Sequence, residues 1–329
     1  MDISAGFSTT LATPQHVAIA EELGYKRAWL YDTPQQSPDV WMALALAAEH
    51  TRRIELGPGV LIPTLRHPMV NASGTATLEA MAPGRVVVGF GTGFTGRRAL
   101  GEKKPISWAY VAEYVRVYRA LLRGETTEWE GARIRMLHGP NDAPPRPIDV
   151  PIIISAFGPK GHEVAMELGD GLFSAISVPA GAKDFSWVSL LCWGTVLGDE
   201  EGWDSPRAKA AGGPGAVLAY HATYELQGPE AVAALPGGRE WLEVVTQTPE
   251  RERHFAIHER HCYGLNAADE VAWAAGGEVL LDQATLSGTA KQVRGKLDEL
   301  ADAGVTEIVY QPVGDIRREL ETFISAAKS

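Results

Sequence analysis

Residues 85–93 read RVVVGFGTG, and a helical pattern begins after Gly96. A β-branched run that ends in glycines and leads into a helix is typical of a buried strand followed by a βα turn. Residues 150–160, VPIIISAFGPK, repeat the pattern further along the chain. Parallel strands bring their carboxyl ends to one edge, so the two stretches predict an α/β sheet that gathers small residues and backbone N–H groups at one rim.

Strand-like and helix-like segments alternate along most of the chain. The expected strands are residues 3–7, 27–31, 54–61, 85–91, 152–155, 171–176 and 305–310. The expected helices are residues 13–23, with Thr13 as the cap, and 39–50, 67–82, 107–123, 161–168, 289–303 and 316–327, while residues 126–138 resemble a β-hairpin. This rhythm predicts a (β/α)₈ TIM barrel of eight βα units, and the alternative is a doubly wound sheet with a helical cap.

Residues 180–285 interrupt the rhythm with glycine clusters. We expect one domain over residues 1–329, in which this stretch holds strand seven and a long insertion or lid before the last βα unit. A strand is predicted at Ala216–Tyr224, and helices around Pro229–Val245 and Pro249–His261. Long insertions on barrels often cover the active site, so the stretch is expected to contact the substrate.

Composition excludes several classes of protein. The chain has 329 residues and a formal net charge of −11, without a long cluster of basic residues, so nucleic acid and anionic membranes are poor partners. The two cysteines, Cys192 and Cys262, form neither a disulfide framework nor a metal-ligand pair. Without a signal peptide or a membrane-length apolar run, we expect a cytoplasmic protein that acts on a small-molecule substrate.

The stretch Gly91–Gly96 matches the pattern G-x-G-x-x-G. It follows the fourth predicted strand, and the acid about twenty residues further on, Glu113, lies inside a predicted helix, so a dinucleotide fingerprint is disfavoured. Two interpretations remain open. Either a flat ring or a phosphate tail approaches the glycines at the rim, or the glycines only ease packing.

Residues at three other strand ends are candidates for ligand binding or catalysis. Residues 157–161 open a helix, where free N–H groups and Lys160 favour an anion, although a plain helix start has the same residues. Asp32 follows an apolar strand and is either a proton-handling carboxylate or a helix cap. Residues 57–63, GPGVLIP, indicate a bulge that supports a planar ring, or a simple turn.

His254, His258 and His261 would share one face of a helix in the insertion. A zinc site there lacks the H-E-x-x-H order and an obvious further ligand, so we expect no metal. We instead expect His258 and His261, together with His221, to contact the substrate.

The motifs together resemble those of the luciferase-like family of flavin- and F420-dependent oxidoreductases, including methylenetetrahydromethanopterin reductase-like members. The matching segments are residues 29–32 (WLYD) with 39–41 (DVW), 57–60 (GPGV) with 66–68 (RHP), 84–93, 150–160 with 169–171 (GDG), and 304–310. Their order and spacing carry the resemblance, which covers the chain except for residues 180–285.

The resemblance implies a barrel, usually dimeric, with F420 or FMN at its carboxyl rim. It places an acid at Asp32, a non-prolyl cis peptide at Gly59–Val60 and the phosphate loop at residues 158–160. Thr33 stands where the family often has a histidine, and residues 39–41 favour F420. The predicted catalytic residues are Asp32, His258 and His261, and the predicted cofactor-binding residues are Phe7, Tyr31, Gly59, Val60, Thr92, Gly93, Ser155, Phe157, Gly158, Pro159 and Lys160.

The leading functional hypothesis is an oxidoreductase that transfers a hydride between F420 or FMN and a small organic substrate. The alternatives are an FMNH₂/O₂-dependent monooxygenase and, from other classes, a non-catalytic flavin-binding protein or a metal-dependent barrel hydrolase. A homodimer is expected.

Overall fold

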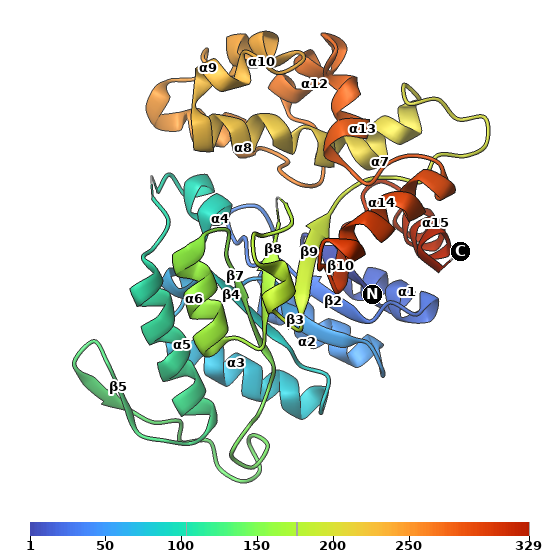
Figure 1. Cartoon of the computed structure of the whole chain (residues 1–329). Helices are drawn as coiled ribbons and strands as arrows, with labels where there is room; N and C mark the ends of the chain where they lie inside the picture. Colours follow the sequence, from blue (N-terminus) through green and yellow to red (C-terminus); the bar gives the residue numbers. More distant parts are fainter. Residues whose placement is uncertain (103, 176, 329) are drawn as a thin grey trace. The chain divides into compact units, whose positions relative to one another are not determined.

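Eight parallel strands form the central sheet in the computed structural model, which describes residues 1–102, 104–175 and 177–328 (Figure 1). The strands are β1 (Asp2–Phe7), β2 (Arg27–Leu30), β3 (Glu55–Pro58), β4 (Val88–Gly91), β7 (Ile152–Ser155), β8 (Gly171–Ser174), β9 (Val188–Cys192) and β10 (Glu307–Tyr310). Their order in the sheet is β3-β2-β1-β10-β9-β8-β7-β4. The strand predicted at 171–176 ends at Ser174, and Ile176 lies outside the described residues.

Backbone contacts between the two outer strands close this sheet into a barrel. Leu56 forms a parallel bridge with Val86, and Leu61 forms one with Phe90. The amide of Leu61 donates to the carbonyl of Gly89 at 2.8 Å, and Gly91 donates back to Leu61 at 3.1 Å. The (β/α)₈ barrel is therefore confirmed, and the open doubly wound sheet is wrong.

Helices follow the strands at most of the predicted places, but the helix after β4 begins at Phe94 and contains Gly96, whereas the helical pattern was expected to begin after Gly96. The helices are α1 (Thr13–Leu23), α2 (Val40–His50), α3 (Pro68–Met81), α4 (Phe94–Ala99), α5 (Trp108–Leu122), α6 (Pro159–Leu168), α14 (Ala290–Asp302) and α15 (Ile316–Lys328). Asp39 caps α2 by accepting from the amides of Trp41 and Met42. The expected cap at Thr13 is wrong, because Ala12 precedes α1 and no side chain caps it. The predicted hairpin is confirmed as β5 (Thr127–Trp129) and β6 (Ala132–Ile134).

A buried charge ties together the strands that meet near the start of β10. Glu307, the first residue of β10, is fully buried and accepts from the indoles of Trp29 at 3.3 Å and Trp187 at 2.6 Å. The hydroxyls of Ser4 and Ser189 also donate to it. These donors stabilise the carboxylate of Glu307. Because Ser4, Trp29 and Ser189 lie on β1, β2 and β9, their hydrogen bonds connect these strands to β10.

The chain divides into two compact units. The barrel unit comprises Met1–Gly96, Lys104–Leu191 and Ala303–Val309, and the helical unit comprises Arg97–Lys103, Cys192–Asp302 and Tyr310–Ser329. Besides α14 and α15, the helical unit contains α7 (Pro206–Ala216), α8 (Leu218–Gln227), α9 (Pro229–Val232), α10 (Gly238–Val245), α11 (Arg253–His258), α12 (Ala267–Ala274) and α13 (Leu280–Ala284). Whether the whole chain behaves as one domain stays a prediction.

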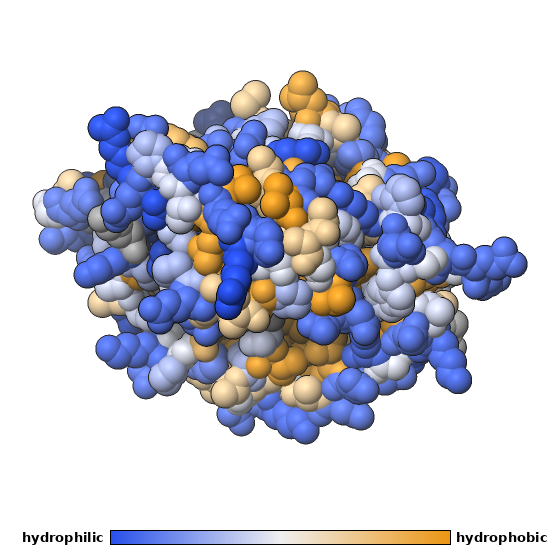
Figure 2. Space-filling view, turned by 90° about the horizontal axis from the view of Figure 1, so that it is seen from above, coloured by the Kyte–Doolittle hydropathy of each residue, from blue (hydrophilic) through white to orange (hydrophobic). Residues whose placement is uncertain are grey.

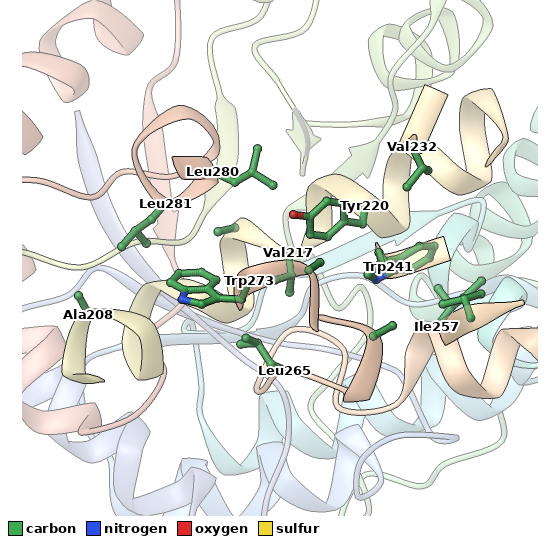
Figure 3. Close-up of a cluster of buried hydrophobic side chains, with 14 of the residues drawn as sticks. Ala208, Val217, Tyr220, Val232, Trp241, Ile257, Leu265, Trp273, Leu280 and Leu281 are labelled. Carbon is green, nitrogen blue, oxygen red and sulfur yellow. The ribbon is translucent and has the colours of Figure 1, made fainter. Parts of the chain in front are cut away.

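The helical unit has its own apolar core (Figure 3). Tyr220 and Trp241 are fully buried and stack with their ring centroids 6.0 Å apart. The strand predicted at Ala216–Tyr224 is wrong, because α7 and α8 occupy that stretch and place Val217 and Tyr220 on one buried face. The helices predicted around Pro229–Val245 and Pro249–His261 are present, although α11 ends at His258, so His261 lies beyond it.

Figure 2 shows a mostly hydrophilic face with apolar residues in small groups. None of the helices in the described ranges is long and apolar enough to cross a bilayer.

Candidate active site

The carboxyl ends of the barrel strands bring several predicted residues into contact. Phe7 and Tyr31 are both buried, and the amide of Tyr31 donates to the carbonyl of Phe7 at 3.0 Å. Ser155 pairs with Gly91 across β7 and β4. This is the end of a (β/α)₈ barrel at which catalytic groups are found.

Asp32 lies directly beyond this strand end and is only 2% exposed. Its Oδ2 accepts from Arg66 Nη1 at 2.6 Å, while Arg66 Nη2 binds Asp39 Oδ2 at 2.7 Å. The other oxygen of Asp32, Oδ1, is buried and accepts no hydrogen bond from the described residues. Asp32 is therefore not a helix cap: it is a buried carboxylate with one paired oxygen and one available oxygen.

Burial and the Arg66 guanidinium have opposite effects on the pKa of Asp32. Burial raises the pKa of the Asp32 carboxyl, Arg66 opposes this, and the charge of Asp39 adds to the increase. Burial works against ionisation of Asp39 as well, but Arg66 and the α2 amides lower the pKa of Asp39 below its usual value. The two carboxyls that share Arg66 therefore differ: the pKa of Asp32 lies above its usual value and the pKa of Asp39 lies below it.

A hydrogen-bonded chain fixes the backbone of Arg66. The hydroxyl of Tyr114 donates to the Arg66 carbonyl at 2.8 Å, Asn71 donates to Tyr114 at 2.7 Å, and Trp41 donates to Asn71 at 3.0 Å. Arg66 was not among the predicted site residues. It lies 34 positions from Asp32, so local pattern gives no sign of the pairing, although the segment RHP had been matched to the family.

The peptide between Gly59 and Val60 is cis, as predicted. Val60 packs on β4: a Cβ at Gly89 would lie 2.7 Å from Val60 Cγ1, and one at Gly91 would lie 3.0 Å from Val60 Cγ2. A Cβ at Gly96 would approach Ile62 to 2.5 Å. At Gly89, Gly91 and Gly96 the absence of side chains therefore serves packing, whereas Gly93 has a left-handed φ of 73°.

The start of α6 is open where the phosphate loop is predicted. Gly158 is the N-cap, no side chain caps the helix, and Pro159 occupies its first turn. No heavy atom of the described residues lies within 4 Å of a Cβ built at Gly158. Phe157 and Lys160 are exposed, and Thr92 and Ser155 are partly exposed. A ligand can therefore approach this helix start without moving the protein backbone.

The three predicted histidines meet in the helical unit. His221 of α8 lies with Nδ1 2.8 Å from His261 Nδ1 and with Nε2 3.0 Å from Asp269 Oδ1. His258 Nε2 lies 2.7 Å from Glu225 Oε1. The prediction that His254, His258 and His261 share one helix face is wrong, because the chain turns after α11 to bring His261 against His221. Among the described residues, no group of three His, Cys, Asp or Glu side chains is arranged to hold a metal ion.

A family model described as luciferase-like monooxygenase matches residues 9–185. The 5,10-methylenetetrahydromethanopterin reductase of Archaeoglobus fulgidus is 28% identical and aligns over 92% of this chain and 90% of its own. The F420-dependent glucose-6-phosphate dehydrogenase of Kineococcus radiotolerans is 36% identical, over 46% of this chain and 48% of its own.

Solved structures share the whole fold. The coenzyme F420-dependent tetrahydromethanopterin reductase from Methanopyrus kandleri superposes with a TM-score of 0.70 at 20% identity, covering 100% of this chain and 99% of that one. A 3,6-diketocamphane monooxygenase component from Pseudomonas putida, in complex with FMN, superposes with a TM-score of 0.61 at 13% identity, covering 99% and 98%. At these identities the structural likeness establishes the fold.

Proposed function

The chain belongs to the luciferase-like monooxygenase family, and we propose that it is an F420-dependent oxidoreductase that transfers a hydride to or from a small organic substrate. The observation that carries the proposal is Asp32, a buried carboxylate with one oxygen available, beyond a barrel strand end that also holds the cis peptide Gly59–Val60. The similarity to a glucose-6-phosphate dehydrogenase and to a tetrahydromethanopterin reductase that are both named as F420-dependent supports F420 as the coenzyme.

The residues present fit such a coenzyme. The open space at Gly158 and the uncapped start of α6 accommodate a phosphate, and Lys160 supplies a positive charge there. Phe7, Tyr31, Gly59, Val60, Thr92, Gly93, Ser155, Phe157 and Pro159 are the other proposed binding residues. When bound, F420 supplies the two-electron chemistry of a hydride carrier, which no protein side chain provides.

The protein itself supplies orientation and proton handling. Asp32 is the proposed catalytic acid or base, and Arg66 holds one of its oxygens so that the other faces a single direction. His258 and His261 are the proposed substrate contacts. We also propose that the chain forms a homodimer in the cytoplasm, which light scattering and cell fractionation test.

Equilibrium titration of the purified chain with F420 and, separately, with FMN tests the proposal. We expect micromolar or tighter binding of F420 and weaker binding of FMN; the reverse order would support an FMN-dependent monooxygenase. Binding without turnover of any small carbonyl compound or alcohol would indicate a non-catalytic binding protein.

The variant Gly158→Val tests whether the phosphate of the coenzyme binds at the start of α6. Gly158 has an ordinary extended backbone, so a side chain fits the fold and fills the open space next to α6. We expect F420 affinity to fall at least about tenfold, because the phosphate loses its place. Gly295→Val, which also adds a side chain in open space but on α14, is the matched control and should bind F420 like the parent.

A further inference from the structure

Asp269 fixes the protonation of the histidine next to it. Asp269 Oδ1 accepts from the indole of Trp241 at 2.8 Å, and its Oδ2 accepts from the amide of Asn266 at 3.0 Å. Asp269 is fully buried, and both of its oxygens accept from N–H groups, as the oxygens of a carboxylate do. An ionised carboxylate only accepts, so the third group at Asp269, His221 Nε2, must carry a proton and donate it.

The tautomer of His221 determines the tautomer of His261, its hydrogen-bond partner. In its neutral form His221 has one donor and one acceptor nitrogen, so with Nε2 donating to Asp269 its Nδ1 carries the lone pair. His261 Nδ1, 2.8 Å away, must then be the donor. The lone pair of His261 consequently lies on Nε2, which makes no hydrogen bond within the described part of the chain.

The backbone on both sides of His261 has conformations that are costly for residues other than glycine. The residues on either side, Arg260 and Cys262, have left-handed φ values of 57° and 70°, which non-glycine residues rarely adopt. The carbonyl of Cys262 accepts from the side chain of Gln311 at 2.6 Å. Strained backbone of this kind persists where surrounding contacts impose it and is common at functional sites.

We propose that Asp269, His221 and His261 form a relay that presents Nε2 of a partly exposed, neutral His261 as a proton acceptor for a hydroxyl or N–H group of a ligand. Asp269 and His221 are positioning residues, and only His261 would touch the ligand. The identification of that ligand with the substrate rests on the proposed function; the relay itself does not.

The surrounding charges define the class of ligand. α8 contributes His221 and Glu225, α11 contributes His254 and His258, and α12 contributes Asp269, while Arg98 lies 3.7 Å from Glu225. Burial, together with His221 and His258, lowers the pKa of His261 well below its usual value. His261 therefore offers no positive charge at neutral pH, so the site suits a neutral hydrogen-bond donor better than a phosphate or carboxylate group.

NMR of histidine ¹⁵N in the full chain without coenzyme tests the relay. We expect His221 as the Nε2–H tautomer and His261 as the Nδ1–H tautomer at neutral pH. His261 as the Nε2–H tautomer would overturn the proposal. Because no coenzyme is present, failure of F420 binding leaves this measurement unaffected.

Two variants distinguish a relay from simple packing. His221→Phe keeps a ring against His261 but removes its acceptor, so His261 should shift to the Nε2–H tautomer. Glu225→Gln changes the partner of His258 and should leave the His261 tautomer unchanged. A His261 tautomer that is the same in His221→Phe as in the parent would contradict the relay.

Ligand class is tested with two probes on the parent chain, 2-propanol and inorganic phosphate. We expect 2-propanol to shift the His261 Nε2 signal and phosphate to leave it unchanged at equal concentration. A shift produced only by phosphate, or by neither probe, would refute the assignment of a neutral-donor site.

Discussion

At the scale of single residues, Arg66 controls the state of Asp32. Arg66 is the only cation that pairs with this carboxylate among the described residues, and the Asp32 side chain is 1% exposed. The substitution Arg66→Met keeps an unbranched stem, removes the guanidinium and leaves a buried carboxylate without its partner. We expect the free energy of unfolding in urea to fall by about 3–5 kcal/mol.

Arg116→Met is the control for this substitution. Arg116 pairs with Glu167 at 2.5 Å, but both side chains are more than half exposed, so the loss should stay within about 0.5 kcal/mol. Adding Asp32→Asn to Arg66→Met should recover most of the lost stability, because the uncompensated charge is gone. Equal losses in the Arg66 and Arg116 variants would show that Asp32 does not depend on its partner.

Asp32→Asn alone separates catalysis from structure. The amide keeps the size of the carboxyl and can still accept from Arg66, but it cannot exchange a proton in the physiological range. We expect turnover, measured with reduced F420 and a substrate found by screening small carbonyl compounds, to fall by about 10²–10⁴-fold while F420 stays bound. Turnover within a few-fold of the parent would remove Asp32 from the reaction.

The sequence located Asp32 but not its environment. A carboxylate after an apolar strand is visible in residues 28–32, whereas its pairing with Arg66 depends on how β2 and the segment before α3 meet in the barrel. The histidines were found as a group, but their links to Asp269 and Glu225 join segments more than thirty residues apart. Tertiary contacts of this kind have no periodic signature.

At the scale of elements, strands bounded by glycine and proline were predicted well, and the glycine-rich helix was not. Residues 212–215, GGPG, are one of the glycine clusters that interrupt the predicted rhythm, and they lie in the last part of α7. A Cβ at Gly212 would lie 2.3 Å from Leu281, and one at Gly215 2.2 Å from Trp193. Close packing therefore selects glycine here, and it overrides the low helix propensity of the residue.

His258 of α11, which is buried, and His261 in the turn after it, which is partly exposed, make the helical unit sensitive to acid. Burial lowers the pKa of His258 and, more strongly, of His261 relative to the unfolded value of 6.5. Below that value the unfolded chain takes up protons that the folded chain resists, so stability is full above about pH 6.5 and is lost as the pH falls.

Thermal unfolding between about pH 7.5 and about pH 5.5 measures this effect. We expect the melting temperature to fall with the pH in the parent, and to fall less in His261→Gln, which has no group to protonate. A parent melting temperature that does not change over this range would show that neither histidine resists protonation.

At the scale of the whole molecule, seven of the eight βα units show the same strand–helix pattern in the sequence, and this repetition predicted the barrel. The bridges from Leu56 to Val86 and from Leu61 to Phe90 close it. The helical unit has no repeat, and its core joins residues from Leu197 to Leu281. Pattern alone could therefore define the barrel and its rim, but could only mark the helical unit as an insertion.

A crystal structure of the chain with bound F420 tests the central claim most directly. We predict the phosphate of the coenzyme at the start of α6 beside Gly158 and Lys160, and its ring against Val60 with Asp32 within hydrogen-bonding reach of the ring or of a substrate on it. A coenzyme bound elsewhere, with the start of α6 and the Asp32 carboxylate untouched, would contradict the account.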